Sequence, residues 1–321
     1  MIDILSMGEV LIDFTPYSGA KGEDVFKQNA GGAPANVVVQ TALLGAKSAF
    51  IGKVGNDNFG KFLKDTLEKY KVSTKGLVVD NEALTTLAFV HLGKNGERDF
   101  TFYRKPGADT LLRYDEVDLS LVDECRIFHF GSISMTCEPS RSTTLSLLEL
   151  VKEKGKIISY DPNYRPMLWE NVSKAKTAMK SVLPFVDIIK VSEDELKMLT
   201  DCDQFLQGIA KLLGYGIKIA VVTQGAKGCI IAGNGGIERL PTYSVTTVDT
   251  TGSGDSFFGA FLFKVAESQK LPGEINFSQL KEFADFANAS GALCSTKYGA
   301  IPAMPSLEEI EDCMRNVSKL N

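Results

Sequence analysis

The stretch VDTTGSGDSFFGAF, residues 248–261, places a carboxylate directly after a run of small residues. Gly252, Ser253 and Gly254 precede Asp255, and an apolar helix is predicted to begin there. A helix start carries unpaired N–H donors and the positive end of the helix dipole, so it attracts anions. Glycines let successive N–H groups converge on one point, because no Cβ blocks a ligand. The pattern predicts a cradle for a phosphate oxygen with a carboxylate beside it, although a tight turn and a first-turn acid would explain the same residues.

A second polar cluster, GGAPAN, opens another predicted helix. Gly31 and Gly32 permit close approach of the backbone, and Asn36 offers both amide donors and an acceptor. A glycine turn that only leads into the helix is the alternative interpretation. Asp13, in VLIDF, is a carboxylate at the end of the first predicted strand. Asp13 alone is weak evidence for a binding site, since acidic residues at strand ends are often solvated.

Other familiar site patterns do not occur in the sequence. GSGDSF does not complete GxGxxG, because Phe257 takes the place of the third glycine, and there is no GxxxxGK[ST]. The six cysteines form no CxxC pair, which argues against a zinc site or disulfide framework and fits a reducing cytosol. His129 lies among apolar residues in IFHFG and is predicted to be a packed strand residue rather than a metal ligand or a member of a catalytic triad.

Length and charge narrow the class of protein. A chain of 321 residues can form one large α/β domain, and its formal net charge of −5 gives no reason to expect a nucleic-acid partner. No apolar run approaches the roughly 18 residues of a membrane helix. The opening MIDILSMGEVLIDF lacks the basic region and cleavage site of a signal peptide. We therefore expect a cytoplasmic protein without a membrane partner.

Strand-like and helix-like segments alternate along most of the chain. The predicted strands are 2–14, 47–55, 127–133, 156–161, 186–191 and 218–223, with an antiparallel pair at 229–233 and 236–242. The predicted helices are 31–46, 57–71, 140–155, 173–180, 193–200 and 204–213, followed by three that begin near 255, 278 and 306. Such alternation predicts a mostly parallel sheet covered on both faces, with ligands beyond the carboxyl ends of its strands. TTLAFVHL and RDFTFYR around GKNGE predict a β-hairpin over 85–104.

Two stretches together resemble a known family. GGAPANVVVQTALLGAKSAFIGKVGNDNFG is similar to the first signature of the ribokinase-like (PfkB) carbohydrate kinases, and VDTTGSGDSFFGAFL to their second. FTFYRKPGADTLL and SYDPNYRPMLW resemble the fructokinase branch. The resemblance covers essentially the whole chain. It implies a single three-layer α/β/α domain over 1–321, with a β lid formed by about 14–30 and 85–104.

The resemblance also implies roles for the residues above. Asp255 matches the catalytic base, and Gly252, Ser253 and Gly254 match the anion hole that stabilises the transferring phosphate. A sugar hydroxyl is a very weak acid, so the base need only orient it and accept its proton late in a loose transition state. The implied sugar contacts are Asp13, Gly31, Gly32 and Asn36, with Arg104, Asn163 and Arg165 as further sugar and phosphate contacts.

Nucleotide and cation positions follow in the same way. The implied ATP contacts are Ser192, Thr223, Gly225, Gly228 and Asn288. Glu195 is expected to order water around Mg²⁺, although Ser192-x-x-Glu195 is also a capping box that explains both residues without a ligand. Asp249 and Thr251 match ligands of a monovalent cation, which leaves K⁺ activation open.

The resulting hypothesis is an ATP-dependent kinase acting on the 6-hydroxyl of D-fructose. The alternatives are a kinase for 2-keto-3-deoxygluconate or another ketose, a phosphofructokinase supported by Arg104 and Arg165, and a regulator that binds sugar or nucleotide without catalysis. The last is disfavoured because Asp255 and both glycines are present. Related kinases pair through their lids, so we also expect a homodimer.

Overall fold

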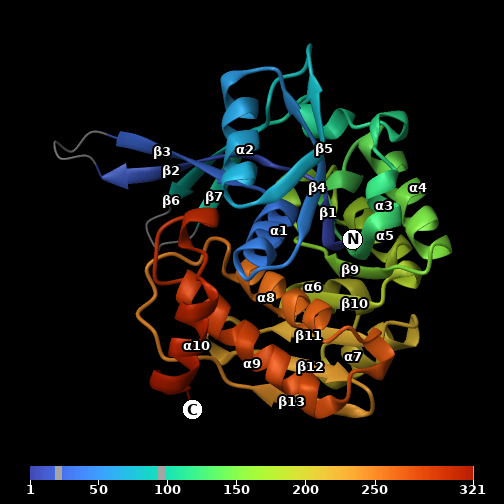
Figure 1. Ribbon diagram of the computed structural model, residues 1–321, viewed down its shortest axis with the longest axis vertical. Helices are drawn as coiled ribbons and strands as arrows, with labels where there is room; N and C mark the ends of the chain where they lie inside the picture. Colours follow the sequence, from blue (N-terminus) through green and yellow to red (C-terminus); the bar gives the residue numbers. More distant parts are fainter. Residues whose placement is uncertain (19–23, 93–97, 321) are drawn as a thin grey trace.

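The protein is built around a nine-stranded sheet in the part of the chain that the structure, a computed structural model, describes: residues 1–18, 24–92 and 98–320 (Figure 1). In spatial order the strands are β13 (Gly236–Leu240), β12 (Cys229–Gly233), β11 (Ile219–Thr223), β10 (Ile188–Ser192), β9 (Ile157–Asp161), β8 (Cys125–Gly131), β1 (Ile2–Met7), β4 (Ser48–Gly55) and β5 (Val72–Asp80). The pairs from β11 to β5 are parallel, and β12 pairs antiparallel with both β11 and β13. This confirms the predicted parallel sheet and the predicted antiparallel pair.

Helices cover both faces of this sheet, which confirms the three-layer α/β/α class. On one face lie α1 (Ala33–Leu43), α2 (Asn58–Lys69), α8 (Ser253–Glu267), α9 (Phe277–Cys294) and α10 (Leu307–Asn316). On the other lie α3 (Ser120–Glu124), α4 (Ser140–Glu153), α5 (Val172–Ser181), α6 (Glu193–Thr200) and α7 (Phe205–Gly214). Successive strand residues alternate between the two cores, as Ile188 and Ile189 do. Strands buried on both sides must be apolar throughout, which explains their continuous hydrophobic runs.

A separate four-stranded sheet, called here the small sheet, projects from the main body (Figure 1). Its order is β3 (Asp24–Gly31), β2 (Leu11–Ser18), β6 (Leu87–Leu92) and β7 (Arg98–Tyr103). The antiparallel pairing of β6 and β7 confirms the predicted hairpin. The predicted turn at 93–97 lies outside the described residues, as does 19–23 of the predicted lid.

The first predicted strand was wrong as a single element. Residues 2–14 instead form β1 of the main sheet and the first part of β2 of the small sheet. The chain changes direction at Gly8, whose φ is +151°, and a Cβ there would come within 2.6 Å of Pro34 Cγ. Asp13 therefore belongs to the small sheet rather than to the end of a central strand. The prediction also missed β5 and the short helix α3.

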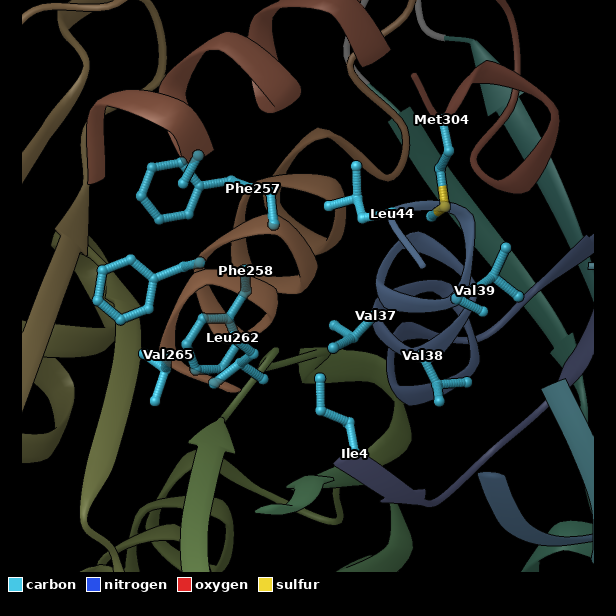
Figure 2. Close-up of a cluster of buried hydrophobic side chains, with 14 of the residues drawn as sticks. Ile4, Val37, Val38, Val39, Leu44, Phe257, Phe258, Leu262, Val265 and Met304 are labelled. Carbon is cyan, nitrogen blue, oxygen red and sulfur yellow. The ribbon is translucent and has the colours of Figure 1, made fainter. Parts of the chain in front are cut away.

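Helices α1 and α8 pack against each other over the main sheet, and Figure 2 shows Val37, Phe258 and Leu262 meeting between them above Ile4. Gly259 permits this contact, because a Cβ there would lie 2.8 Å from the Val37 carbonyl oxygen. Close packing of this kind fixes the two helices relative to each other. Their N-termini, which carry the two glycine-rich motifs, are thereby held side by side.

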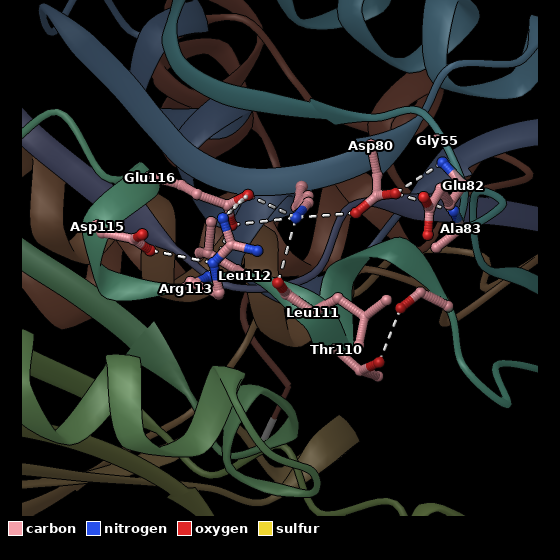
Figure 3. A network of polar contacts seen from close by, with 12 residues as sticks. Gly55, Asp80, Glu82, Ala83, Thr110, Leu111, Leu112, Arg113, Asp115 and Glu116 are labelled. Carbon is pink, nitrogen blue, oxygen red and sulfur yellow. Dashed lines mark hydrogen bonds and ion pairs between the residues drawn. The ribbon is translucent and has the colours of Figure 1, made fainter.

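A buried ion network anchors the chain after the small sheet (Figure 3). Lys53 Nζ on β4 lies 2.8 Å from Asp80 Oδ2 and 2.8 Å from Glu116 Oε1, and it donates to the Leu111 carbonyl oxygen at 3.2 Å. These three partners replace the hydration that the buried ammonium loses. The network therefore ties the segment that returns from β7 to the main sheet.

The interpretation of His129 as a packed strand residue is confirmed. Its Nδ1 lies 3.1 Å from Ser159 Oγ, and burial lowers its pKa to about 3. All six cysteines are free thiols. In the described residues no helix combines the length and apolar character that crossing a membrane requires.

Candidate active site

Two cavities meet at the N-terminus of α8. The first has a volume of about 690 Å³ and is lined by residues from the small sheet, the end of β10 and the start of α8. The second has a volume of about 530 Å³ and lies between α8, α9 and the loops that follow β11 and β13. Thr250 and Gly254 line both cavities. A molecule in one cavity would thus lie next to a molecule in the other.

The backbone between them leaves amides available to a ligand. Gly252 has a φ of +76°, which favours glycine, and it caps α8. In the described part of the chain, the amides of Gly252, Gly254 and Asp255 donate no hydrogen bond. The Ser253 amide instead donates to the Thr250 carbonyl oxygen at 3.2 Å. Unpaired amides at a helix N-terminus can bind an anion, so this stretch is called the anion cradle here, and the predicted role of Gly252, Ser253 and Gly254 as an anion hole stays a prediction.

Asp255 is buried beside this cradle and lines the first cavity. Its Oδ2 accepts a hydrogen bond from Asn36 Nδ2 at 2.8 Å, and its Oδ1 accepts one from Asn163 Nδ2 at 3.3 Å. Burial raises the pKa of Asp255, while Lys190 and the bond from Asn36 oppose that rise. A carboxylate held by two amides and raised in pKa suits a general base better than a solvated aspartate does.

Close contacts explain the paired glycines before α1. A Cβ on Gly31 would lie 2.0 Å from Asp13 Oδ2, and one on Gly32 would lie 2.4 Å from the Glu9 carbonyl oxygen. Asp13, Gly32 and Asn36 line the first cavity. Among the described groups, Asn36 Oδ1 finds no hydrogen-bond partner although it is buried. A polar ligand in the first cavity would compensate that oxygen.

Asn163 and Arg165 enter the first cavity from the loop after β9. Asn163 has a φ of +44°, a left-handed conformation that asparagine tolerates better than most residues. Its backbone amide donates to Asp161 Oδ1 at 3.2 Å, which holds the turn. Arg165 Nη1 donates to the Tyr164 carbonyl oxygen at 3.2 Å. Both residues therefore line the same cavity as Asp13 and Asn36, and their predicted contacts with sugar and phosphate stay a prediction.

Lys190 is a site residue that the sequence interpretation missed. It lines the first cavity, and its Nζ lies 2.7 Å from Asp161 Oδ2. A Cβ on Gly254 would lie only 3.1 Å from this ammonium, so the glycine allows the charge to sit against the cradle. Burial lowers the pKa of Lys190, but the carboxylates around it, led by Asp161, outweigh burial and raise it. The sequence feature that could have indicated Lys190 is a single lysine inside the mostly apolar strand sequence IIKVS.

Glu9 was missed as well. It lines the first cavity and accepts a hydrogen bond at Oε1 from the Ala33 amide, in the first turn of α1, at 3.0 Å. Its Oε2 is buried without a hydrogen-bond partner among residues 1–18, 24–92 and 98–320. Burial raises its pKa to about 7, against the opposing effect of Arg104. This carboxyl is a second polar group near the cavity that the described chain leaves uncompensated.

Arg104 does not line the first cavity, and its guanidinium is hydrogen-bonded to other groups. Its Nε donates to Asp109 Oδ2 at 2.8 Å, and Nη1 donates to Thr136 Oγ1 at 2.7 Å. Nη2 donates to the Ile133 carbonyl oxygen at 3.2 Å. These bonds join the end of β7 to the main body. The predicted contact of Arg104 with substrate stays a prediction.

Ser192 and Glu195 form the expected capping box at the start of α6. The Glu195 amide donates to Ser192 Oγ at 3.2 Å, and the Ser192 amide donates to Glu195 Oε2 at 2.8 Å. Glu195 Oε1 also accepts from the Tyr164 amide at 2.8 Å. Both residues line the first cavity, although Ser192 was predicted on the nucleotide side. A carboxylate has further lone pairs beyond these two bonds, so Glu195 can still accept from water.

The remaining predicted ATP contacts line the second cavity. Thr223 reaches it from the end of β11, Gly225 and Gly228 from the loop that follows, and Asn288 from α9. Gly228 has a φ of +87°, and a Cβ there would lie 2.0 Å from the Leu240 carbonyl oxygen. Asn288 Nδ2 donates to the Pro241 carbonyl oxygen at 3.3 Å. The structure thus gathers these four residues in one place.

Asp249 holds the loop before α8. Its Oδ1 accepts from the Thr251 amide at 2.8 Å, and its Oδ2 accepts from the Gly299 amide at 2.9 Å. Thr251 lines the first cavity, whereas Asp249 lines neither of the two cavities. Their predicted role as K⁺ ligands stays a prediction. No group of three or more His, Cys, Asp or Glu side chains in the described chain is arranged to hold a metal ion.

Known proteins are similar to this chain over nearly its whole length. The family model for pfkB family carbohydrate kinases matches residues 1–307. The chain is 43% identical over 320 residues to probable fructokinase-5 of Arabidopsis thaliana, with 98% of each chain covered. It is also 43% identical over 308 residues to fructokinase-2 of Oryza sativa subsp. japonica, covering 95% of this chain and 91% of that one.

Solved structures are similar over nearly the whole chain. A fructokinase from Xylella fastidiosa with bound ATP superimposes with a TM-score of 0.90 at 34% identity, with 98% of each chain covered. A double mutant of a fructokinase from Vibrio cholerae O395, with fructose, ADP and potassium ion bound, gives a TM-score of 0.89 at 32% identity, again with 98% of each chain covered.

Proposed function

The chain belongs to the pfkB family of carbohydrate kinases, and we propose that it is an ATP-dependent fructokinase that phosphorylates the 6-hydroxyl of D-fructose. One observation carries the proposal: Asp255 lies where two cavities meet, beside three backbone amides that donate no hydrogen bond within the described part of the chain. The first cavity suits a polyhydroxyl ligand and the second a nucleotide. Phosphoryl transfer requires this arrangement, because the attacking hydroxyl oxygen and the leaving oxygen of ADP must lie in line on either side of the γ-phosphoryl group that is transferred.

Asp255 acts as the base in this proposal. It accepts a hydrogen bond from the 6-hydroxyl and orients that hydroxyl toward the γ-phosphorus. It receives the hydroxyl proton as the new O–P bond forms and the bond from the γ-phosphorus to the bridging oxygen of ADP breaks, which releases ADP. The amides of Gly252, Gly254 and Asp255 stabilise the charge that develops on the transferring phosphate. The Lys190 ammonium, held by Asp161, adds a positive charge beside the cradle.

The sugar is held by the polar groups of the first cavity. Asp13 and Asn36 offer charge-assisted and amide hydrogen bonds to neighbouring hydroxyls, and Asn163 and Arg165 are further proposed contacts in this cavity. Arg104 does not line the cavity and remains a proposed contact only. An analogue without those hydroxyls would leave buried groups unpaired, which is the basis of selectivity. Leu11 and Phe102 of the small sheet also line the cavity. The small sheet therefore acts as a lid that excludes water, the competing phosphoryl acceptor.

Magnesium fits the residues present. Few protein ligands are expected, because Mg²⁺ keeps several waters and binds mainly to substrate phosphates. Glu195 would accept hydrogen bonds from waters of the bound ion, on the first-cavity side of the cradle. When bound, the ion neutralises negative charge on the phosphates. Asp249 and Thr251 remain the proposed ligands of a K⁺ ion that would adjust the cradle.

We also propose a homodimer formed through the small sheet. Phe14 and Phe89 stack with their ring centroids 4.7 Å apart, and Phe26 and Tyr103 each pack against Phe89 in a T-shaped arrangement. Phe26 is 40% exposed and Tyr103 is 63% exposed. An aromatic surface beside the edge strands β3 and β7 suits burial against a second copy. A Tyr103→Glu variant should lower the molar mass measured by light scattering, whereas a monomeric wild type would contradict this proposal.

A coupled assay for ADP release tests the activity. Fructose, ribose, glucose, fructose 6-phosphate, 2-keto-3-deoxygluconate and adenosine would be compared with and without K⁺. We expect the highest kcat/KM with fructose, and the product should be consumed by an enzyme specific for fructose 6-phosphate. A higher kcat/KM with 2-keto-3-deoxygluconate or with fructose 6-phosphate would replace the proposed substrate. The free cysteines are in keeping with a cytoplasmic setting, which a localisation experiment on the full chain would test.

A further inference from the structure

The segment at residues 317–320 is paired with a distant loop. The Ser244 amide donates to the Ser318 carbonyl oxygen at 2.8 Å, and the Leu320 amide donates to the Thr242 carbonyl oxygen at 2.8 Å. These two bonds create a short antiparallel pairing between residues far apart in sequence. The pairing places Leu320 in the lining of the second cavity, with 36% of its surface exposed.

Side chains reinforce this pairing. Lys319 Nζ lies 2.8 Å from Asp285 Oδ1 on α9, and it also lies 5.4 Å from the centroid of the Tyr243 ring. Tyr243 is buried, and its hydroxyl donates to Asp285 Oδ1 at 3.1 Å. One carboxylate thus joins the segment, the loop and the helix. A surface ion pair alone would contribute little, but here a cation–π contact and a buried tyrosine share it.

The paired loop forms much of the second cavity. Between β13 and α8 the chain has no regular helix or strand apart from the single bridge at Tyr243. Thr242, Tyr243, Val245, Thr247 and Thr250 of this loop all line the cavity. An irregular loop depends on outside contacts for its conformation. Residues 317–320 supply such contacts.

The two ends of the second cavity differ in chemistry. Ser253 and Gly254 lie at the end next to the anion cradle, where phosphates are expected. Leu320 lies at Thr242, next to the Pro241 carbonyl that accepts from Asn288. Val245 and Ala292 add apolar surface to the lining. A flat aromatic base is best held by apolar contacts and a few polar groups, so the end with Leu320 suits the base.

We propose that residues 317–320 form a wall of the nucleotide site, that Leu320 packs against the base of ATP, and that Lys319 holds this wall in place. This inference rests on the proposed function, because it takes the second cavity as the nucleotide site. It adds a contact that raises the affinity for the nucleotide through the base and not through the phosphates.

A Leu320→Ser variant tests the proposal by isothermal titration with two probes. ADP carries a base, whereas tripolyphosphate does not. We expect the Kd for ADP to rise about tenfold, the effect of one to two buried methylene groups, and the Kd for tripolyphosphate to stay unchanged. In the coupled assay, KM for ATP should rise while KM for fructose stays unchanged. Leu206→Ser, at an exposed leucine of α7, is the matched control and should change neither Kd.

A second variant tests the anchoring. Lys319→Met removes the ion pair with Asp285, and we expect a rise of about threefold in the Kd for ADP. Unchanged ADP binding in Leu320→Ser would overturn the proposal, as would an equal weakening of ADP and tripolyphosphate. The proposed function can fail separately. A wild-type chain that binds ADP but phosphorylates no sugar would refute the kinase activity, and the ADP titrations would still test whether residues 317–320 contribute to nucleotide binding. A wild-type chain that binds no ADP would overturn both.

Discussion

Replacing Asp255 with asparagine separates the chemistry of this carboxylate from its place in the fold. The amide keeps the shape of the side chain and can still accept from Asn36, at the shorter of the two bonds. It cannot accept the proton of the acceptor hydroxyl. General-base catalysis contributes about 10²- to 10⁴-fold, so kcat should fall by that factor, equivalent to about 3 to 5 kcal/mol of activation free energy.

Stability should respond differently from rate. Burial raises the pKa of Asp255, so the folded protein holds this carboxylate at a cost in free energy at neutral pH. For a carboxyl group with a raised folded-state pKa, stability falls as pH rises through that pKa, because the unfolded chain then binds fewer protons than the folded one. Asp255→Asn removes the cost of burying a charged carboxylate. It also loses the hydrogen bond from Asn163, which contributes about 1 kcal/mol. We expect a Tm at pH 7 close to or above that of the wild type.

The assay combines kcat from ADP release with Tm from calorimetry at several pH values. The advantage of the variant in Tm should shrink as pH falls below the folded-state pKa, where the wild-type carboxyl is protonated. Glu267→Gln, at an exposed carboxylate in the last turn of the same helix, should change neither kcat nor Tm. A wild-type kcat in Asp255→Asn would refute the assignment of the base. A fall in Tm of about 10 °C or more would mean that the residue is mainly structural.

Three other perturbations give direct readouts. Gly31→Ala places a Cβ 2.0 Å from a carboxylate oxygen of β2, so KM for fructose should rise at least about tenfold, while Gly214→Ala, whose Cβ meets nothing within 4 Å, should leave it unchanged. Lys190→Met should lower both kcat and Tm, since an unpaired buried carboxylate costs about 3–5 kcal/mol. Adding Asp161→Asn should restore Tm but not kcat, and recovery of both would contradict a role for the ammonium in catalysis. Backbone amides and Lys53 lower the pKa of Asp80 from 3.8 to about 2, so Asp80→Asn should be less stable to urea at pH 7, with the difference vanishing as pH falls from about 4 toward 2. A difference that persists at low pH would contradict the ion network.

Local patterns in the sequence determined most elements and the two glycine-rich helix starts. Apolar runs predicted the central strands, and Ser192-x-x-Glu195 predicted a cap that forms as expected. These features depend on neighbours within a few residues, so a single sequence reveals them. The same holds for the cradle before α8, because a helix N-terminus exposes its amides wherever the helix lies.

Only the tertiary structure decided which distant groups meet. Asn36 and Asp255 are 219 residues apart, and they touch because α1 and α8 pack closely on one face of the sheet. The split of residues 2–14 between two sheets, the Lys190 pair with Asp161, and the pairing of 317–320 with the loop after β13 likewise depend on contacts across the whole fold. Sequence periodicity records which face of an element is buried, but it does not record which partner buries it.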